Sequence, residues 1–427
     1  MLETDHSGGS HTSPSSASTL KLGRVRPVTD KPLDQHKRRQ DVEAILKHIE
    51  AHTDEYVSRV TQDCAQPSIS AHGEGLDEMA HLVAEMLRGI GFEVALISPG
   101  AENAPPVVLG QMKGSSDRTL LLYNHYDVQP VDPLDEWVTP PFEPDVRDGK
   151  VYARGTADNK GSIVSRVCAL EAYLAHREEL PIDIVWVIEG EEEVGSPHLN
   201  DFAHQHADLL QRAYGCVWEA GGKNARDRYE IALGCKGLLY VELRTQEAVR
   251  DLHSAMAATV ANPAWRLLWA LNTLKSPDGR VRIAGFYDNV RPISPAQRQA
   301  LADWDYPEEK VKQLYGIERF LDDLTGDELK ERLIFGPTCN VDGFHAGYGG
   351  PGSKTVLPCR ASAKLDFRLV PDQDPERVLR LLQGHLEREG FGDVEVIASD
   401  DGPRRSPGEH PVVGDPAHPF VETCVRT

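Results

Sequence analysis

Apolar residues recur at helical and strand-like spacings from about Arg38 onward, and this pattern predicts the elements of the chain. Val42, Ile45 and Leu46 open the first helical repeat, which reaches Val57. Further helices are predicted at 76–90, 160–176 and 196–210, the last with Ser196 as its N-cap. Short apolar runs predict strands at 92–97, 107–109, 119–123, 182–188 and 214–218. Strands that alternate with helices in this way indicate an α/β domain with a mostly parallel sheet.

The pattern changes after about Gly222, where predicted strands follow one another closely. Strands are expected at 231–234, 238–245, 364–369 and 394–397, and helices at 263–274 and 375–389. Paired strands with helices on one side are typical of an α+β unit. We therefore predict a catalytic domain over 38–225, an inserted α+β domain over 226–400, a return to the first domain over 401–427, and a linker at 400–411.

Composition and charge narrow the classes of function. The chain has 427 residues, of which 46 are Lys or Arg and 67 are Asp or Glu, so its formal net charge is −21. This balance argues against a nucleic-acid partner, because binding to phosphates requires basic surfaces. No apolar run is long enough to span a membrane. Seven scattered cysteines without a C-x-x-C pair favour reduced thiols in a cytoplasmic protein. The polar segment 1–37 predicts a disordered tail.

Clusters of ionisable residues lie where predicted strands end or a predicted helix begins. His125 and Asp127 follow one strand, and the segment Glu189–Ser196, which contains a run of three glutamates, follows another. Glu219 follows a third strand, and Asp158 precedes a helix. Because ligands of open α/β sheets bind at the carboxyl ends of strands, these clusters can converge. One imidazole with several carboxylates suits Zn²⁺ or Mn²⁺.

Each cluster taken alone also has a structural explanation. A lone histidine at a strand end is more often hydrogen-bonded within the fold, and a run of glutamates is usually a solvated face. Asp158 before Asn-Lys-Gly is typical of a turn. However, glutamates placed between an apolar strand and a Gly turn repel one another unless a cation or a proton compensates them. The recurrence of such clusters at four element ends therefore favours a metal site.

Four segments together resemble one family of enzymes. They are LLLYNHYDVQPVDPLDEWVTPPFEPDVRDGKVYARGTADNKG, WVIEGEEEVGS, DLHSA followed by NP, and PTCNVDGFHAGYGGPGSKTVLP leading to LDFRLVP. From about Arg38 to its end the chain resembles the metallopeptidase family that includes carnosinase, related bacterial dipeptidases, aminoacylase and acetylornithine deacetylase. The segment between His125 and Asp158 is more similar to the dipeptidase branch. The resemblance implies hydrolysis of dipeptides or short peptides by a water that bridges two divalent metal ions, Zn²⁺ or alternatively Mn²⁺ or Co²⁺.

The resemblance also implies a role for each residue of the metal site. His125 and Glu219 would bind the first metal, and Glu193 would bind the second. Asp158 would bridge the two metals, and Asp127 would orient the ring of His125 from behind. Such a site lowers the pKa of the bridging water, so that a hydroxide can attack the peptide carbonyl.

The remaining roles implied by the resemblance concern the general base and the inserted domain. Glu192 would take the proton from the attacking water. His253 would stabilise the developing oxyanion, Arg368 would bind the free carboxylate of the substrate, and Thr338 would be a further substrate contact. The inserted domain would act as a lid and pair two copies into a homodimer, with His253 serving the site of the partner.

One part of the family pattern has no counterpart in the chain. Members carry a last metal-binding histidine in a His-x-x-Asn-Glu-like context, and neither His410 nor His418 matches it. We therefore expect a C-terminally truncated chain that binds its second metal weakly and has little activity. Two other functions stay open: an N-acyl amino-acid amidohydrolase, which shares the chemistry, and a catalytically inactive dimerising homologue or fragment.

Overall fold

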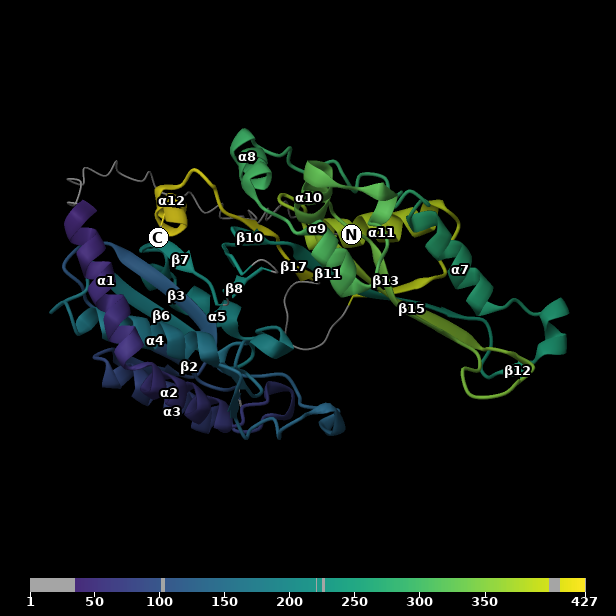
Figure 1. Cartoon of the computed structure of the whole chain (residues 1–427). Coiled ribbons are helices and arrows are strands. Elements are labelled where there is room, and N and C mark those ends of the chain that lie inside the picture. Colours follow the sequence, from purple (N-terminus) through teal and green to yellow (C-terminus); the bar gives the residue numbers. More distant parts are fainter. Residues whose placement is uncertain (1–34, 101–103, 220, 225–226, 399–407, 427) are drawn as a thin grey trace, which may run out of the picture.

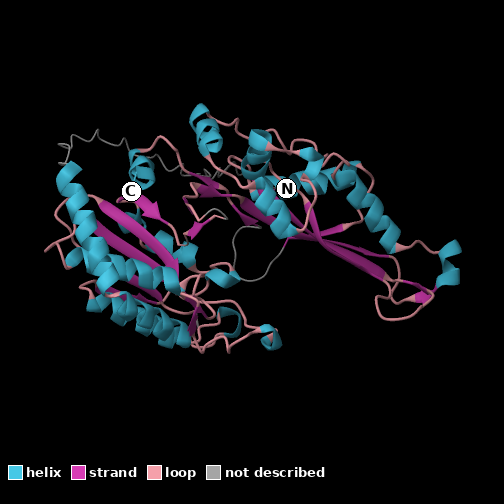
Figure 2. Ribbon diagram, viewed as in Figure 1, coloured by secondary structure: helices cyan, strands magenta, loops and turns pink. Residues whose placement is uncertain are grey.

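The described part of the chain folds around two larger β-sheets, each with its own hydrophobic core, and short strand pairs accompany them. The computed structural model describes residues 35–426 except 101–103, 220, 225–226 and 399–407. The predicted tail thus lies outside the described residues, apart from its last positions, which begin helix α1. The first sheet and its helices form one unit, and the strands of the second sheet extend away from it (Figures 1 and 2).

The first unit has a five-stranded sheet in the order β1-β2-β6-β3-β7. Its strands are β1 (Glu93–Ile97), β2 (Val107–Met112), β3 (Thr119–His125), β6 (Asp183–Glu189) and β7 (Ala213–Val217). Its helices are α1 (Gln35–Ala51), α2 (Thr53–Ala65), α3 (Leu76–Gly89), α4 (Lys160–Leu174), α5 (Leu199–Gln205) and α6 (Ala207–Leu210). Between β3 and α4, the strands β4 (Asp145–Arg147) and β5 (Lys150–Tyr152) form an antiparallel hairpin. Only β2 is reversed, so the prediction of a mostly parallel sheet is confirmed.

Strand β6 shows why the central strands are continuous apolar runs. All seven of its residues are buried. Because successive side chains of a strand point to opposite faces, Ile184, Trp186 and Ile188 pack in the core that contains α3 and α4. Val185 and Val187 instead pack in the core that contains Phe202 of α5. The sheet is therefore covered on both faces, and polar side chains can approach it only at its edges and strand ends.

The second unit has an antiparallel sheet in the order β13-β15-β11-β16. Its strands are β11 (Gly237–Gln246), β13 (Asn340–Ala346), β15 (Arg360–Leu369) and β16 (Glu395–Ala398), and the short pair β12 (Leu252–His253) and β14 (Val356–Leu357) lies beyond them. Its helices are α7 (Pro263–Leu274), α8 (Pro295–Asp303), α9 (Glu308–Tyr315), α10 (Gly326–Phe335) and α11 (Pro375–Arg388).

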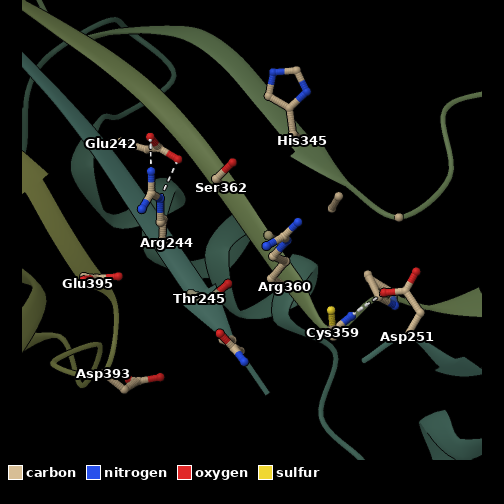
Figure 3. Close-up of a pocket in the computed structure, with 15 residues that line it drawn as sticks. Glu242, Arg244, Thr245, Asp251, His345, Cys359, Arg360, Ser362, Asp393 and Glu395 are labelled. Atoms are coloured by element: carbon tan, nitrogen blue, oxygen red, sulfur yellow. Dashed lines mark hydrogen bonds and ion pairs between the residues drawn. The ribbon is translucent and has the colours of Figure 1, made fainter. Parts of the chain in front are cut away.

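One face of this second sheet is apolar and the other is polar. Alternate residues of β15 are buried, and Ala363, Leu365 and Phe367 pack with side chains from α7 and α11. The opposite face carries a polar groove of about 860 Å³, where Arg244 hydrogen-bonds to Glu242 at 2.8 Å (Figure 3). None of the predicted site residues lines this groove.

The segment after β6 differs from the predicted single helix over 196–210. Glu192–Val194 forms a 3-10 turn, after which Gly195 and Ser196 both adopt positive φ values, 85° and 50°. Ser196 is therefore not an N-cap; its hydroxyl instead donates to Glu189 Oε1 at 2.7 Å. Helix α5 begins only at Leu199, and α6 follows as a separate turn. Local left-handed backbone thus delays the helix by more than half a turn.

Two further expectations need correction. Residues 231–234 are not a strand: only β9 (Tyr229–Glu230), which pairs with β8 (Gly222–Lys223), and β10 (Gly234–Cys235) are extended there. The predicted linker at 400–411 lies largely outside the described residues, but its end forms β17 (Gly408–Glu409) on β11. β18 (Val412–Val413) then pairs with β10.

The chain finally returns to the first sheet. Helix α12 (Pro419–Arg426) lies beside β7 in Figure 1. Phe420 packs so closely over Gly215 that a Cβ at Gly215 would lie 2.5 Å from the ring. The rings of His418 and Tyr214 are 5.5 Å apart. Glycine is therefore required at position 215 for this contact.

Candidate metal centre

Three parallel strands of the first sheet end at the same edge, and each leads to ionisable side chains. β3 ends at His125, β6 leads to Glu192 and Glu193, and β7 leads to Glu219. The loop before α4 adds Asp158, which lies 2.9 Å from His125. Because the carboxyl ends of parallel strands meet at one edge, the fold brings together all the predicted metal ligands.

His125 is buried and presents its two ring nitrogens to different partners. Nδ1 lies 3.1 Å from the backbone oxygen of Asp127 and 3.3 Å from its Oδ1. Both are acceptors, so Nδ1 carries the hydrogen. Nε2 faces carboxylate oxygens of Asp158 at 2.9 Å, Glu219 at 3.4 Å and Glu192 at 3.9 Å. The nitrogen that is free to bind a cation thus faces three carboxylates.

The electrostatics of the cluster favour a positive charge beside His125. Burial alone would lower the pKa of His125, but hydrogen bonds to two aspartates and the charges of nearby carboxylates outweigh it and raise this pKa to about 11. Burial raises the pKa of Glu192 to about 7 and also raises the pKa values of Glu193 and Glu219, with neighbouring carboxylates adding to each shift. Carboxylates held this close together are stabilised by a bound cation.

Asp127 connects the histidine to the turn that carries the glutamates. Its side chain is fully buried, and its two carboxylate oxygens accept hydrogen bonds from the backbone N–H groups of Glu192 at 3.2 Å and Glu193 at 3.0 Å. One carboxylate therefore holds both the ring of His125 and the start of the glutamate turn. These are the contacts expected of a residue that orients metal ligands.

The donor set fits divalent metal ions. Oε2 of Glu219 is buried and has no hydrogen-bond partner, although a buried carboxylate oxygen without a donor or a cation is costly. Ligand atoms of His125, Glu192 and Glu193 lie within 4.8 Å of one another. One imidazole nitrogen among several carboxylate oxygens suits Zn²⁺ or Mn²⁺.

The structure adds residues that the sequence reasoning missed. Nε2 of Gln129 donates to Oε2 of Glu193 at 2.7 Å and so fixes that carboxylate. Glu189 is buried and accepts hydrogen bonds from Tyr123 and Ser196, so it supports the turn that follows β6. Gln129 lies only four residues after His125, and this closeness in the sequence is the signal that could have indicated a role at the site.

The predicted residues of the inserted domain lie in two different places. Thr338 and Arg368 are neighbours, since the N–H of Thr338 donates to the carbonyl of Arg368 at 3.0 Å. His253 is exposed, and the strand that carries it, β12, lies beyond the opposite end of the β11–β15 ladder (Figure 1). The ladder from Leu238, opposite Arg368, to Gln246 extends about 26 Å. His253 and Arg368 of one chain therefore cannot contact the same small substrate in this structure.

The sequence of the chain is similar to the sequences of known peptidases. The family model for peptidase family M20/M25/M40 matches residues 121–396, a stretch that contains the whole metal cluster and runs from within β3 to within β16. The chain belongs to this peptidase family. It shares 29% identity over 368 residues with the Beta-Ala-His dipeptidase of Mus musculus, covering 81% of this M20 chain and 73% of that protein. It shares 28% identity over 369 residues with the Cys-Gly metallodipeptidase of Schizosaccharomyces pombe, covering 82% and 76%.

Solved structures agree with this assignment. An M20 family metallo-carboxypeptidase from Sulfolobus solfataricus is 38% identical, with a TM-score of 0.79 over 87% of this M20 chain and 82% of that one. Human carnosine dipeptidase 1 is 27% identical, with a TM-score of 0.71 over 90% and 84%. The predicted family, the α/β fold and the assignment as a metallopeptidase-type hydrolase are confirmed. In the part of the chain that the structure describes, no helix is long and apolar enough to cross a membrane.

Proposed function

We propose that this chain is a two-metal exopeptidase that hydrolyses dipeptides or short peptides. The observation that supports this most is the placement of His125 Nε2 against Asp158, Glu219 and Glu192 at the open end of three parallel strands. The relatives named above as dipeptidases and as a carboxypeptidase support the substrate class. In this proposal His125 and Glu219 would hold the first metal, Glu193 would hold the second, and Asp158 would serve both.

The chain's own residues divide the work of hydrolysis. Two divalent cations, when bound, supply Lewis-acid polarisation and lower the pKa of water. Glu192 is about one-third exposed, so its carboxylate can reach a water at the open side of the cluster and take its proton. The oxygen of this water bonds to the carbonyl carbon of the peptide, the C–N bond then breaks, and Glu192 donates the proton to the leaving amine. Asp127 and Gln129 keep His125 and Glu193 in place during these steps.

Arg368 and Thr338 form the proposed site for the free carboxylate of the substrate. Arg368 is half exposed, and its Nε lies 3.4 Å from a carboxylate oxygen of Asp366, so the outer edge of the guanidinium can still form a bidentate pair with a carboxylate. A substrate with a free C-terminus is expected from this arrangement. His253 stabilises the oxyanion in the site of a second copy, because it lies too far from Arg368 of its own chain.

The first test of this proposal is metal-dependent turnover. The purified chain is stripped with a chelator, reloaded with Zn²⁺ or Mn²⁺, and given Beta-Ala-His, Cys-Gly, a tripeptide and N-acetyl amino acids. We expect the peptide hydrolysis that the chain shows, however slow, to be abolished by chelation and restored by metal. We also expect metal at about a hundred times its Kd to add roughly 2.7 kcal/mol of stability in thermal unfolding. Hydrolysis of N-acetyl amino acids in preference to peptides would contradict the substrate class.

We also propose a homodimer formed through the second unit. Edge strand β13 pairs with β15 on one side, and Val341 and Phe344 on β13 are exposed. Helix α7, which packs on β15 and β11, exposes Trp265, Leu268 and Trp269 as a stripe at i, i+3 and i+4 spacing. A second copy would cover both the open strand edge and this stripe.

A charged side chain in the apolar stripe of α7 is expected to dissociate the dimer. Trp269→Glu places a charge in the apolar stripe of α7, so we expect a shift from dimer to monomer in analytical ultracentrifugation. Leu314→Glu on α9, which replaces another highly exposed apolar residue, is the matched control and should leave the mass unchanged. If Trp269→Glu still sediments as a dimer, like the wild type, the interface between the two copies does not include this stripe.

A further inference from the structure

Arg166, on α4, reaches the strand ends that carry the metal ligands. Its Nη1 donates to the carbonyl of Tyr123 at 2.8 Å and to the side-chain oxygen of Asn124. Its Nη2 donates to the carbonyl of Trp218 at 2.8 Å and to the carbonyl of Glu219. One guanidinium therefore joins the residues just before His125 to the ligand Glu219 itself.

These contacts occur where the sheet no longer joins β3 to β7. The register between the two strands ends at Leu122 and Val217, and each chain then continues toward its metal ligand. Beyond that point the backbone carbonyls of Tyr123, Trp218 and Glu219 receive hydrogen bonds from the planar guanidinium of Arg166. The separation of the two strand ends is thus set by a side chain from a helix.

The same network extends to the loop that carries Asp158. Asn124, which accepts from Arg166, donates through its Nδ2 to the side chain of Asn159, the neighbour of Asp158. The indole Nε1 of Trp186 also donates to Asn124, at 3.0 Å. Arg166 is therefore connected to three ligand-bearing segments by direct hydrogen bonds or through one buried amide.

Arg166 leaves the carboxylate of Glu219 free. Its hydrogen bonds go to backbone carbonyls and to an amide, whereas Oε2 of Glu219 has no hydrogen-bond partner and lies 3.4 Å from His125. A direct ion pair would compete with a metal for this oxygen. Contact through the carbonyl fixes the residue without that competition.

We propose that Arg166 is a positioning residue of the metal site, which holds Glu219 and His125 at the separation that one cation requires. This inference rests on the proposed function, because it assigns Arg166 a role toward the same metal. Residues that orient ligands from behind change metal affinity by about 10- to 100-fold when they are replaced. A lysine at 166 keeps the charge but cannot bridge two strand ends with a fork.

The test compares Arg166→Lys and Arg166→Met with a matched control, Arg59→Lys. Arg59 also pairs with α4, through Glu171, but lies outside the network just described. Affinity and stoichiometry for Zn²⁺ are measured by isothermal titration calorimetry, and Co²⁺ absorption reports the ligand geometry. Unfolding of each metal-free variant is measured in parallel. We expect both Arg166 variants to lose about 10- to 100-fold in affinity for one ion, with an altered Co²⁺ spectrum.

Arg59→Lys should lower only the unfolding midpoint and leave the affinity unchanged. If Arg166→Met does not fold, Arg166→Lys decides the question alone. Affinity within twofold of wild type and an unchanged Co²⁺ spectrum in the Arg166 variants would overturn the positioning role while leaving the proposed function intact. A wild-type chain that binds no metal would overturn both.

Discussion

Replacing Glu192 by Gln reduces peptide hydrolysis by about 10²- to 10⁴-fold while metal binding is retained, the loss expected when a general base is removed. Gln keeps the size of the side chain but cannot take a proton. In the structure Glu192 lies 3.9 Å from His125 Nε2, farther than Asp158 or Glu219, and its side chain is partly exposed. It is therefore placed to face a water at the open side of the cluster.

The neighbouring glutamate supplies a matched comparison. Glu193 is held by Gln129 and is the proposed ligand, so Glu193→Gln should weaken metal binding, whereas Glu192→Gln should not. Initial rates on a dipeptide and calorimetric titration with Zn²⁺ separate the two effects. Equal rates for Glu192→Gln and wild type would remove Glu192 from the mechanism and favour the inactive-homologue interpretation.

Replacing Lys160 by Met is expected to cost the first unit about 3 kcal/mol of unfolding free energy, the lower end for removing one partner of a buried charged group. Lys160 is fully buried, and its ammonium donates to the carbonyl of Asp63 at 3.3 Å and to that of Gln66, at the end of α2. Methionine fills the space but leaves both carbonyls unpaired. It also leaves the buried carboxyl of Asp63 without a nearby positive charge.

Urea denaturation followed by circular dichroism measures this loss. Lys47→Met is the control, because Lys47 forms an exposed ion pair with Glu43 at 3.0 Å and such pairs contribute at most about 1 kcal/mol. Asp63→Asn should recover part of the loss in the double variant, since it removes the uncompensated carboxyl. Equal losses for Lys160→Met and Lys47→Met would show that the buried contacts contribute little to stability.

Local sequence determined the elements whose signals are contained within a few residues. Helix α7 begins at Pro263 and ends at Leu274 as predicted, because Asn262 caps the first turn and apolar residues recur at helical spacing. Strands β3 and β6 were predicted from apolar runs that fill a sheet buried on both faces. The four predicted ligands His125, Asp158, Glu193 and Glu219 follow from residue types at strand ends together with the resemblance to one family.

Only the tertiary structure decided which of these residues meet and what holds them. Ser196 carries the sequence signal of an N-cap, but its hydroxyl bonds Glu189, because the left-handed turn before it directs it back toward β6. Arg166 and Lys160 have no distinctive local pattern, since their partners are backbone carbonyls of segments far away in the sequence. A sequence specifies local conformation and residue chemistry, whereas contacts between distant backbone groups exist only after the sheet has formed and the loops have closed.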